Sequence, residues 1–413
     1  MITTICVYFF AYINFQKIQI ERIGKISMQN DSLWEQEQEL RRTCMLMITH
    51  QCNLNCSYCY ESYKSNLKMD FDTAINIIKR DAQKVKKSKK IQGLEIDLMG
   101  GEPMMNFPLI KELVEWAEKG NIEVPYIFAM TTNGTLFEDK EKEWFKKHKK
   151  SIICCCSYDG NVELQEINRG KNSKYIDIDF FVKTWPFQNL HMTVSKETLP
   201  NLSEGILFAQ KKGYPVEVSL AEGINWSKED SKIYKKELEK LAIFYLENSQ
   251  YKPINLLMRY LNIVNPAKDR KVIKKFCGTG SFMTAYEPDG SAYGCHMFSP
   301  IVLGENAKQI SDINFKCNSI ANDEICTNCV LKHYCPTCAG FNYRYRKDFG
   351  LRDKSKCAMQ LQEAIISAKF QIKLIAQRKN KLTLEDAQHA NQAIKTISII
   401  ENVKDTMHYP YSL

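Results

Sequence analysis

The sequence predicts an α/β fold in which a partial (β/α)6 TIM-like barrel is followed by a cysteine-rich module and a C-terminal helical tail. Short apolar runs rich in β-forming residues alternate with longer amphipathic runs rich in lysine and glutamate, which is the pattern of repeated βα units. Short polar motifs follow several of the apolar runs. The 16 cysteines of the 413-residue chain gather in clusters, a distribution that favours metal sites over disulfide bonds.

Six strands are expected in the barrel, and this number favours an open or partial barrel over a complete eightfold one. The strands are predicted at residues 44–49, 94–99, 126–132, 152–158, 190–195 and 216–221. The amphipathic runs between them have apolar residues at helical spacing, so each strand is expected to lead into a helix. In such barrels the chemistry lies at the carboxyl ends of the strands.

Five regions are expected along the chain. They are an N-terminal extension at 1–42, the barrel at 43–225, a helical linker at 226–276, the cysteine-rich module at 277–358 and the helical tail at 359–413. Helical periodicity on both sides of a break near residues 380–383 predicts that the tail is a helical hairpin. The apolar run at 1–15 is too short to cross a bilayer, and Met28 offers an alternative start.

Composition and charge limit the partners. The run at 1–15 lacks a basic region and a small-residue cleavage site, so the predicted compartment is the reducing cytoplasm. The formal net charge of +9 draws on lysine-rich stretches at 79–90 and 140–150, which are expected on exposed helix faces. Ionised thiolates at metal sites would lower this charge. We therefore expect no nucleic-acid or membrane partner, whereas an acidic peptide would be attracted.

The stretch THQCNLNCSYCYES places Cys52, Cys56 and Cys59 directly after the first strand. A structural zinc site closes its tetrahedron with four protein ligands, so a site of these three thiols and His50 has to be considered. A [4Fe–4S] cluster also takes four ligands, and three thiolates leave one iron open to an exogenous ligand. Three thiols in one loop are therefore compatible with either a zinc site or a reactive iron–sulfur cluster.

Polar loops also follow the next three strands. They are GGEP at 100–103, NGT at 133–135 and DG at 159–160. By itself GGEP is typical of a turn before a helix with proline at its first position. Because the carboxyl ends of barrel strands meet at one face, we expect all of these loops to lie near the three cysteines.

The spacing CxxxCxxC, with Tyr58 before the last cysteine, resembles the signature loop of radical S-adenosylmethionine (SAM) enzymes. The resemblance implies that Cys52, Cys56 and Cys59 hold a [4Fe–4S] cluster whose open iron binds SAM. It further implies one-electron reduction by an external flavodoxin- or ferredoxin-like donor and release of a 5′-deoxyadenosyl radical. The cofactors would supply the chemistry, and the protein would supply orientation and exclusion of water.

The same resemblance implies a set of cofactor-binding residues. These are Tyr58 over the adenine, Gly100, Gly101 and Glu102 beside the methionine amino group, and Thr132, Asn133, Ser157 and Arg169 at the ribose or carboxylate. Glycine suits such a position because a backbone without a side chain can come close to a ligand.

The run CTNCVLKHYCPTC resembles the SPASM domain, an extension of radical SAM enzymes that holds auxiliary iron–sulfur clusters. Cys277, Gly290 and Cys295 upstream are spaced as in that domain. One departure is that only two residues separate Cys335 from Cys338, where relatives usually have three.

Two auxiliary [4Fe–4S] clusters are implied. One would use Cys326, Cys329, Cys335 and Cys357, and the other would use Cys277, Cys295 and Cys338, with Cys317, a substrate thiolate or nothing as the fourth ligand. A pair of zinc sites is the alternative, since CxxC is also typical of zinc binding.

Two substrate classes compete. Similar enzymes either mature ribosomally made precursor peptides, often by joining a cysteine sulfur to carbon in a thioether, or oxidise a cysteine or serine of sulfatases to formylglycine. The sulfatase-maturing group has an aspartate where this chain has His296, the candidate catalytic base, and a polar residue where it has Met99. Peptide maturation is therefore favoured.

The SAM-binding motifs argue against a simple electron carrier, which needs none of them. Fewer than fifty residues precede the first strand, so we expect leader recognition in the helical tail or in a separate leader-binding protein.

Overall fold

The computed structural model describes residues 40–265, 268, 277–310, 323–378 and 382–403. The expected extension at 1–42 lies almost wholly outside these residues, as do Cys6 and Cys317. No helix in the described part of the chain combines the length and apolar character needed to cross a bilayer.

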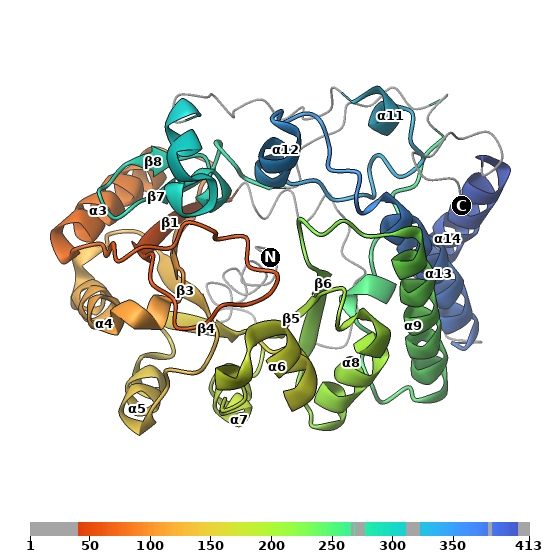
Figure 1. The fold of residues 1–413 in the computed structure, drawn as a ribbon, viewed down its shortest axis with the longest axis horizontal. Helices are drawn as coiled ribbons and strands as arrows, with labels where there is room; N and C mark the ends of the chain where they lie inside the picture. Colours follow the sequence, from red (N-terminus) through yellow and green to blue (C-terminus); the bar gives the residue numbers. More distant parts are fainter. Residues whose placement is uncertain (1–39, 266–267, 269–276, 311–322, 379–381, 404–413) are drawn as a thin grey trace.

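All six expected strands form. Strands β1 (Arg41–Thr49), β2 (Gly93–Gly100), β3 (Tyr126–Thr132) and β4 (Ile152–Cys156) pair in parallel in the order β4-β3-β2-β1, and β5 (Leu190–Val194) pairs in parallel with β6 (Val216–Leu220). An isolated parallel bridge between Ser157 and His191 connects the end of β4 with β5. Figure 1 shows the six strands following one arc. The parallel α/β architecture is confirmed, and closure into one partial barrel stays a prediction.

Helices alternate with these strands and cover the outer side of the arc (Figure 1). They are α3 (Phe71–Lys87), α4 (Phe107–Trp116), α5 (Asp139–His148), α6 (Val162–Arg169), α7 (Ile178–Thr184) and α8 (Leu202–Lys211). Helix α3 illustrates the local causes: Asp70 caps its first turn by accepting from the Thr73 N–H, and lysines gather in its last turn. Short helical turns are η1 (Pro103–Asn106), η2 (Ala117–Asn121), η3 (Lys171–Ser173), η4 (Leu199–Asn201), η5 (Asn255–Leu257), η6 (His296–Phe298) and η7 (Gly304–Gln309).

Strand β1 is buried along its whole length, as expected for a central parallel strand covered on both faces. Alternate side chains such as Leu46 and Ile48 face the core shared with α3 and α4, whereas Met45 and Met47 pack into a second core with residues of the cysteine-rich region. The two cores therefore share β1.

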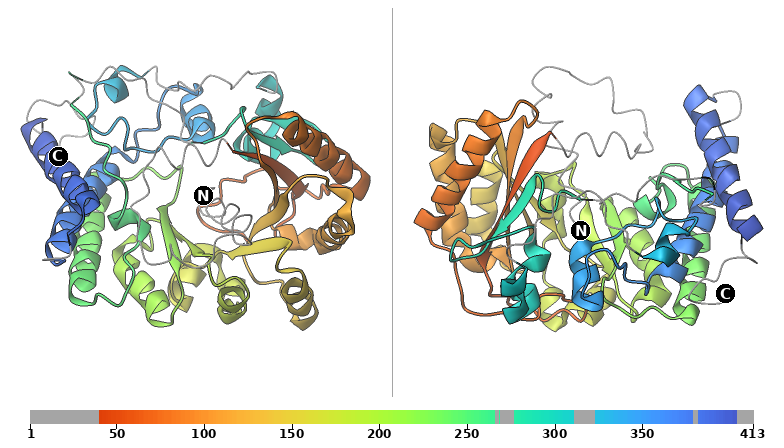
Figure 2. Two further views of the ribbon diagram at one scale, coloured as in Figure 1. Left: turned by 180° about the vertical axis from the view of Figure 1, so that it is seen from behind. Right: turned by 90° about the horizontal axis from the view of Figure 1, so that it is seen from above.

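The cysteine-rich region adds strands to the main sheet. Strand β7 (Met283–Tyr286) pairs in parallel with β1, and β8 (Ala292–Tyr293) pairs antiparallel to β7. Figure 2 shows this extension beside β1 from behind. The region also contains α10 (Pro300–Leu303), α11 (Glu324–Thr327) and α12 (Ala339–Arg346). The expected boundary at residue 277 stays a prediction, but β7 makes this region continuous with the sheet.

The C-terminal helices α13 (Cys357–Ala376) and α14 (Leu384–Val403) pack side by side, with α13 against α9 (Lys228–Glu247) (Figures 1 and 2). Glu363 of α13 is 1% exposed and accepts hydrogen bonds from Tyr234 of α9 at 2.8 Å and from Tyr334 at 3.1 Å. It also pairs with Arg259 at 2.7 Å. This buried carboxylate ties α9, the following segment and the cysteine-rich region to one helix.

Candidate functional site

The three cysteines of the first loop lie half-buried and reduced. All fourteen described cysteines are free of disulfide bonds. Burial raises the pKa of Cys52 to about 11 and also raises the pKa of Cys56 and Cys59. Such thiols ionise readily only beside a strong positive charge or a bound metal, which deprotonates a coordinating thiol outright.

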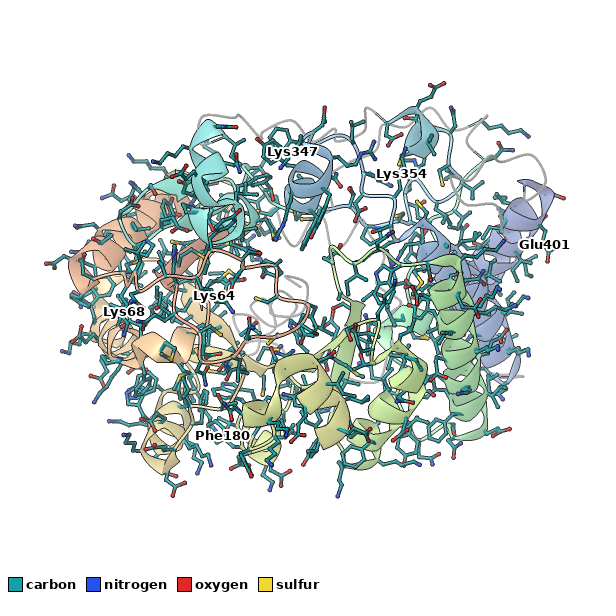
Figure 3. All side chains as sticks on the ribbon, viewed as in Figure 1. Lys64, Lys68, Phe180, Lys347, Lys354 and Glu401 are labelled. Carbon is teal, nitrogen blue, oxygen red and sulfur yellow. The ribbon has the colours of Figure 1, made fainter. Side chains whose placement is uncertain are left out.

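Lys64 supplies a positive charge beside these thiols, and nothing in the sequence marked it apart from its nearness to the three cysteines. Its ammonium group donates to the Leu54 carbonyl at 3.3 Å, and Figure 3 shows it on the same loop as the cysteines. Burial lowers the pKa of Lys64, but Cys59 and Cys52 outweigh this and raise it. Lys64 is therefore placed to favour ionised thiolates, and the donor set fits an iron–sulfur cluster.

His50 does not complete a zinc site with the three cysteines. Its Nε2 lies 2.6 Å from Glu287 Oε2, and its Nδ1 lies 3.1 Å from Ser65 Oγ, so both ring nitrogens have protein partners. Among the described residues, no three Cys, His, Asp or Glu side chains converge closely enough to hold a single metal ion. His50 instead connects the end of β1 with the residue that follows β7.

The glycines of GGEP let the end of β2 touch the cysteine loop. A Cβ added to Gly100 would lie 2.1 Å from the Thr49 carbonyl oxygen, and one added to Gly101 would lie 2.4 Å from that of Gln51. The Gly101 N–H donates to Thr49 O at 3.1 Å, and the Glu102 N–H donates to Gln51 O at 2.8 Å. Close backbone packing therefore requires glycine here before any ligand is considered.

Glu102 holds the loop that follows β3, at residues 133–135, through hydrogen bonds. It is buried, and its carboxylate accepts from Thr132 Oγ1 at 2.7 Å, from the Asn133 N–H at 2.7 Å and from the Met104 N–H at 3.1 Å. Burial raises the pKa of Glu102, and these hydrogen bonds oppose the rise. Because a carboxylate offers about four acceptor positions, about one remains for an amino group of a ligand.

Asn53 connects the cysteine loop with the third loop. Its Oδ1 accepts from Asn133 Nδ2 at 2.8 Å, and its Nδ2 donates to Thr135 Oγ1 at 2.8 Å. The loops after β1, β2 and β3 therefore form one hydrogen-bonded unit, as their expected position at one face predicts.

Asp159 holds Tyr58 and Arg169 together. Its carboxylate is fully buried and accepts from Tyr58 Oη at 2.9 Å, from Arg169 Nε and Nη2 at 2.8 and 3.1 Å, from Asn168 Nδ2 at 3.0 Å and from the Thr193 N–H at 2.9 Å. The Arg169 guanidinium also lies 5.4 Å from the centre of the Tyr58 ring. The DG motif marked Asp159 in the sequence, but its role as the common partner appears only in the structure.

Two further backbone contacts join the cysteine loop to α6 and the end of β4 to the end of β3. The Ser57 N–H donates to the Asn168 carbonyl at 2.8 Å, and the Ser157 N–H donates to the Thr132 carbonyl at 2.9 Å. The structure therefore gathers all eight predicted cofactor-binding residues around the three-cysteine loop: Tyr58, Gly100, Gly101, Glu102, Thr132, Asn133, Ser157 and Arg169. Their role towards a cofactor stays a prediction.

In the cysteine-rich region, neighbouring thiols raise one another's pKa in two separate groups. Burial raises the pKa of Cys357, and the nearby Cys335, Cys326 and Cys329 raise it further. Burial likewise raises the pKa of Cys338 to about 12 with Cys277 as the next cause, and raises that of Cys295 with Cys338 and Cys277 as neighbours. Whether each set binds a cluster stays a prediction.

His296, the predicted catalytic base, is buried between the two cysteine regions. Its Nε2 lies 3.2 Å from Tyr60 Oη, whereas its Nδ1 has no hydrogen-bond partner among the described residues. Burial lowers the pKa of His296 to about 4. The ring is therefore neutral near pH 7, and its role as a base stays a prediction.

Known proteins resemble this chain in sequence. The family model for a 4Fe–4S single cluster domain matches residues 41–174. An uncharacterized protein of Methanocaldococcus jannaschii is 32% identical over 176 residues, 40% of this chain and 57% of that protein. The radical SAM cyclopropyl synthase TigE of Paramaledivibacter caminithermalis is 23% identical over 350 residues, 76% of this chain and 71% of that protein.

Solved structures resemble it in fold. The structure of native anSMEcpe with bound AdoMet superposes with a TM-score of 0.57 at 17% identity and covers 82% of this chain and 100% of that one. The structure of Streptococcus suis SuiB bound to precursor peptide SuiA superposes with a TM-score of 0.51 at 13% identity. The superposition covers 84% of this chain and 87% of that one. At these identities the likeness supports the parallel α/β fold.

The Gly101→Ala substitution should push the cysteine loop away from β2. We expect the free energy of unfolding to fall by about 1–3 kcal/mol through overpacking, and bound iron to fall with it after anaerobic reconstitution. Urea unfolding and iron analysis measure the two effects.

Gly213→Ala is the matched control, because a Cβ at this position would meet open space. Its positive φ of 80° should still lower the free energy of unfolding by about 1 kcal/mol. An equal loss of iron in both variants would contradict the steric explanation.

The Asp159→Asn substitution should leave the buried Arg169 guanidinium without its counter-charge. We expect the free energy of unfolding to fall by about 3 kcal/mol, as measured by urea unfolding under anaerobic conditions. Asp179→Asn, which removes an exposed ion pair with Lys183, should change little. Equal effects of the two substitutions would show that the Asp159 network is not a stabilising unit.

Proposed function

We propose, from the premise that this chain is an iron–sulfur-dependent enzyme of the radical SAM type, that it modifies a ribosomally synthesised precursor peptide by forming a cysteine thioether crosslink. The observation that carries the proposal is the hydrogen-bonded unit of strand-end loops around Cys52, Cys56 and Cys59. An electron-transfer protein would have no need for such a unit.

The residues of this chain would have separate tasks at the cofactor. When bound, the cluster and SAM supply reductive cleavage of SAM to a 5′-deoxyadenosyl radical that abstracts a substrate hydrogen. Cys52, Cys56 and Cys59 would hold the cluster, and Lys64 would stabilise their negative charge. Glu102 would use its free acceptor position for the methionine amino group, while Asp159 fixes the Tyr58 ring and the Arg169 guanidinium.

Thioether formation replaces one S–H and one C–H bond by a C–S bond. The carbon gives up a hydrogen atom, the thiol gives up its proton, and one electron remains to be accepted. Cys277, Cys295 and Cys338 would hold an auxiliary cluster, and that cluster would supply a site for the substrate thiolate and an acceptor for the electron. Cys295 is buried and adjoins His296, whose Nε2 lies 3.2 Å from Tyr60 Oη of the first loop, and this position supports the role.

The sulfatase-maturing alternative rests on the superposition with anSMEcpe, whereas SuiB, of similar fold, is recorded with a precursor peptide. The sulfatase-maturing group has an aspartate where this chain has His296 and a polar residue where it has Met99. These two departures favour peptide crosslinking. An external electron donor and a separate leader-binding protein belong to the same proposal.

Replacing Cys52, Cys56 and Cys59 by alanine should remove one cluster, about four iron atoms per chain, and abolish formation of 5′-deoxyadenosine from SAM and dithionite. Iron analysis and chromatography measure the two results. The control is Cys155→Ala, a buried strand cysteine outside the predicted sets, which should retain both. Absence of 5′-deoxyadenosine from the wild-type chain would eliminate the assignment itself.

Replacing Cys277, Cys295 and Cys338 by alanine should abolish the crosslink while SAM cleavage continues. The test substrate is a cysteine-containing precursor peptide, and mass spectrometry measures the mass of the product. A thioether retains sulfur and loses two hydrogens, whereas formylglycine made from cysteine loses sulfur. Full crosslinking by the triple variant would contradict the assigned role, and loss of sulfur in the wild-type product would favour the alternative.

A further inference from the structure

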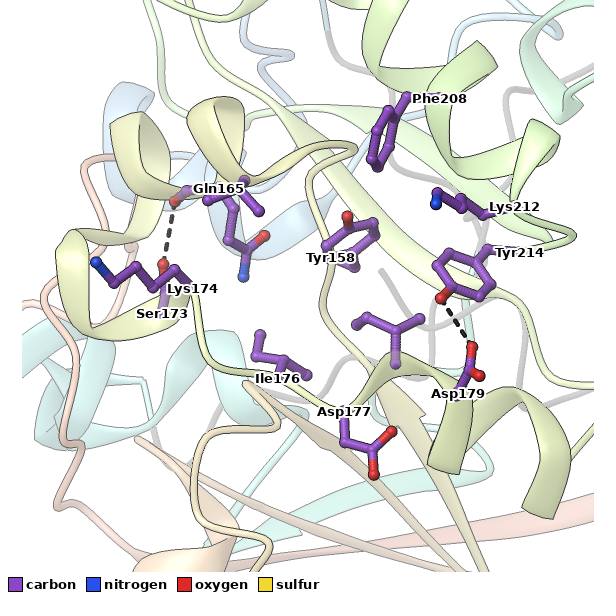
Figure 4. A pocket seen from close by; sticks show the side chains of 12 residues that line it. Tyr158, Gln165, Ser173, Lys174, Ile176, Asp177, Asp179, Phe208, Lys212 and Tyr214 are labelled. Atoms are coloured by element: carbon purple, nitrogen blue, oxygen red, sulfur yellow. Dashed lines mark hydrogen bonds between the residues drawn. The ribbon is translucent and has the colours of Figure 1, made fainter.

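A cavity of about 310 Å³ lies among α6, η3, the start of α7 and the end of α8 (Figure 4), and no cysteine lines it. Its apolar wall is formed by the rings of Tyr158, Phe208 and Tyr214 together with Val162 and Ile176. Val162 is 51% exposed and Phe208 is 39% exposed, so the wall continues to the surface. The volume matches the lower end of ligand pockets, about 300 Å³.

A buried hydrogen-bond donor faces this cavity. Gln165 is 1% exposed, and its Oε1 accepts from the Asp159 N–H at 2.8 Å. Its Nε2 has no hydrogen-bond partner among the described residues, and Figure 4 shows the amide directed between Ser173 and Tyr158. A buried amide without an acceptor is unfavourable, so a ligand oxygen at this point would be stabilised.

The carboxylates at the cavity already have partners in the protein. Asp177 Oδ2 pairs with Lys142 at 2.9 Å. Asp179 pairs with Lys183 at 2.7 Å and accepts from Tyr214 Oη at 2.8 Å. Their negative charge is therefore largely compensated, and they offer little to a basic ligand.

The two lysines that line the cavity form fewer and longer ion pairs than its two carboxylates do. Lys212 Nζ lies 5.9 Å from the centre of the Phe208 ring and forms no ion pair with any described carboxylate. Lys174 Nζ lies 4.9 Å from the centre of the Tyr175 ring and 3.8 Å from Glu166 Oε1, a long separation for an ion pair. The cavity therefore combines an aromatic wall, a buried amide donor and positive charge, which together suit an acidic and apolar ligand.

We propose that this cavity binds a segment of the peptide substrate in which an aromatic or branched aliphatic side chain lies next to an acidic one. The apolar side chain packs against Phe208 and Tyr158, a peptide oxygen accepts from Gln165 Nε2, and the acidic side chain lies near Lys212. The exposed edge at Val162 and Phe208 lets the peptide continue outside the cavity. This inference rests on the proposed peptide substrate and assigns it an anchoring site whose lining contains no cysteine.

The test uses the full chain without SAM or reductant and an acetylated, amidated Asp-Phe-Asp peptide with a fluorinated ring, titrated by ¹⁹F NMR. We expect Phe208→Ala to weaken binding about tenfold, because the ring loses its main apolar contact. Lys212→Glu should weaken binding severalfold and should favour the corresponding Lys-Phe-Lys peptide.

Two matched controls accompany these variants. Lys211→Glu makes the same charge change one residue earlier on α8, outside the cavity, and Phe187→Ala removes another exposed ring. Both should keep affinity within about twofold of wild type. The proposal is overturned if the wild-type chain does not bind the peptide at millimolar concentration, if Phe208→Ala binds as wild type does, or if Lys211→Glu acts like Lys212→Glu.

The experiments distinguish failure of the anchoring-site proposal from failure of the proposed enzymatic function. Peptide binding with no 5′-deoxyadenosine from the reconstituted chain would remove the enzymatic proposal and keep the cavity. SAM cleavage and crosslinking with no binding of the tripeptide would keep the enzyme and overturn the cavity as an anchoring site.

Discussion

The fully buried carboxylate of Asp159 is the interaction on which the candidate site depends. It brings together a tyrosine from the cysteine loop, an arginine from α6 and a backbone amide at β5. An isolated buried carboxylate would be strongly unfavourable, and its many donors offset that cost. Each donor is in turn held at one position, so a charge that must be satisfied fixes the geometry of three elements.

The same principle operates at the other loops. Glu102 is a second buried carboxylate and fixes the third loop through Thr132 and Asn133, while its backbone touches the cysteine loop. Gly100 and Gly101 make that backbone approach possible because they have no Cβ. The cysteine loop is thus held by the Asp159 carboxylate through Tyr58 and by the backbone of Gly101 and Glu102, which orders it in advance of any cofactor.

The pairing of β1 with β7 positions the cysteine-rich region against the main sheet. Met45 and Met47 on one face of β1 belong to the core of that region, and Cys44, Leu46 and Ile48 on the other face belong to the core of the α3 and α4 side. His50 adds a buried link to Glu287. The two parts therefore share a strand and a core, and their relative position does not depend on a flexible linker.

The sequence by itself determined the six strands, the helices between them and the concentration of polar motifs at strand ends, because hydrophobic periodicity and turn chemistry are local properties. Its motifs also led to eight candidate cofactor-binding residues at or beside the strand ends, whose role stays a prediction. Only the tertiary structure decided that β7 joins β1, that His50 is bound to Glu287, that Asp159 is the common partner of Tyr58 and Arg169, and that Gln165 faces a cavity. These facts depend on contacts between residues far apart in the chain, and no local pattern encodes which buried donor meets which acceptor.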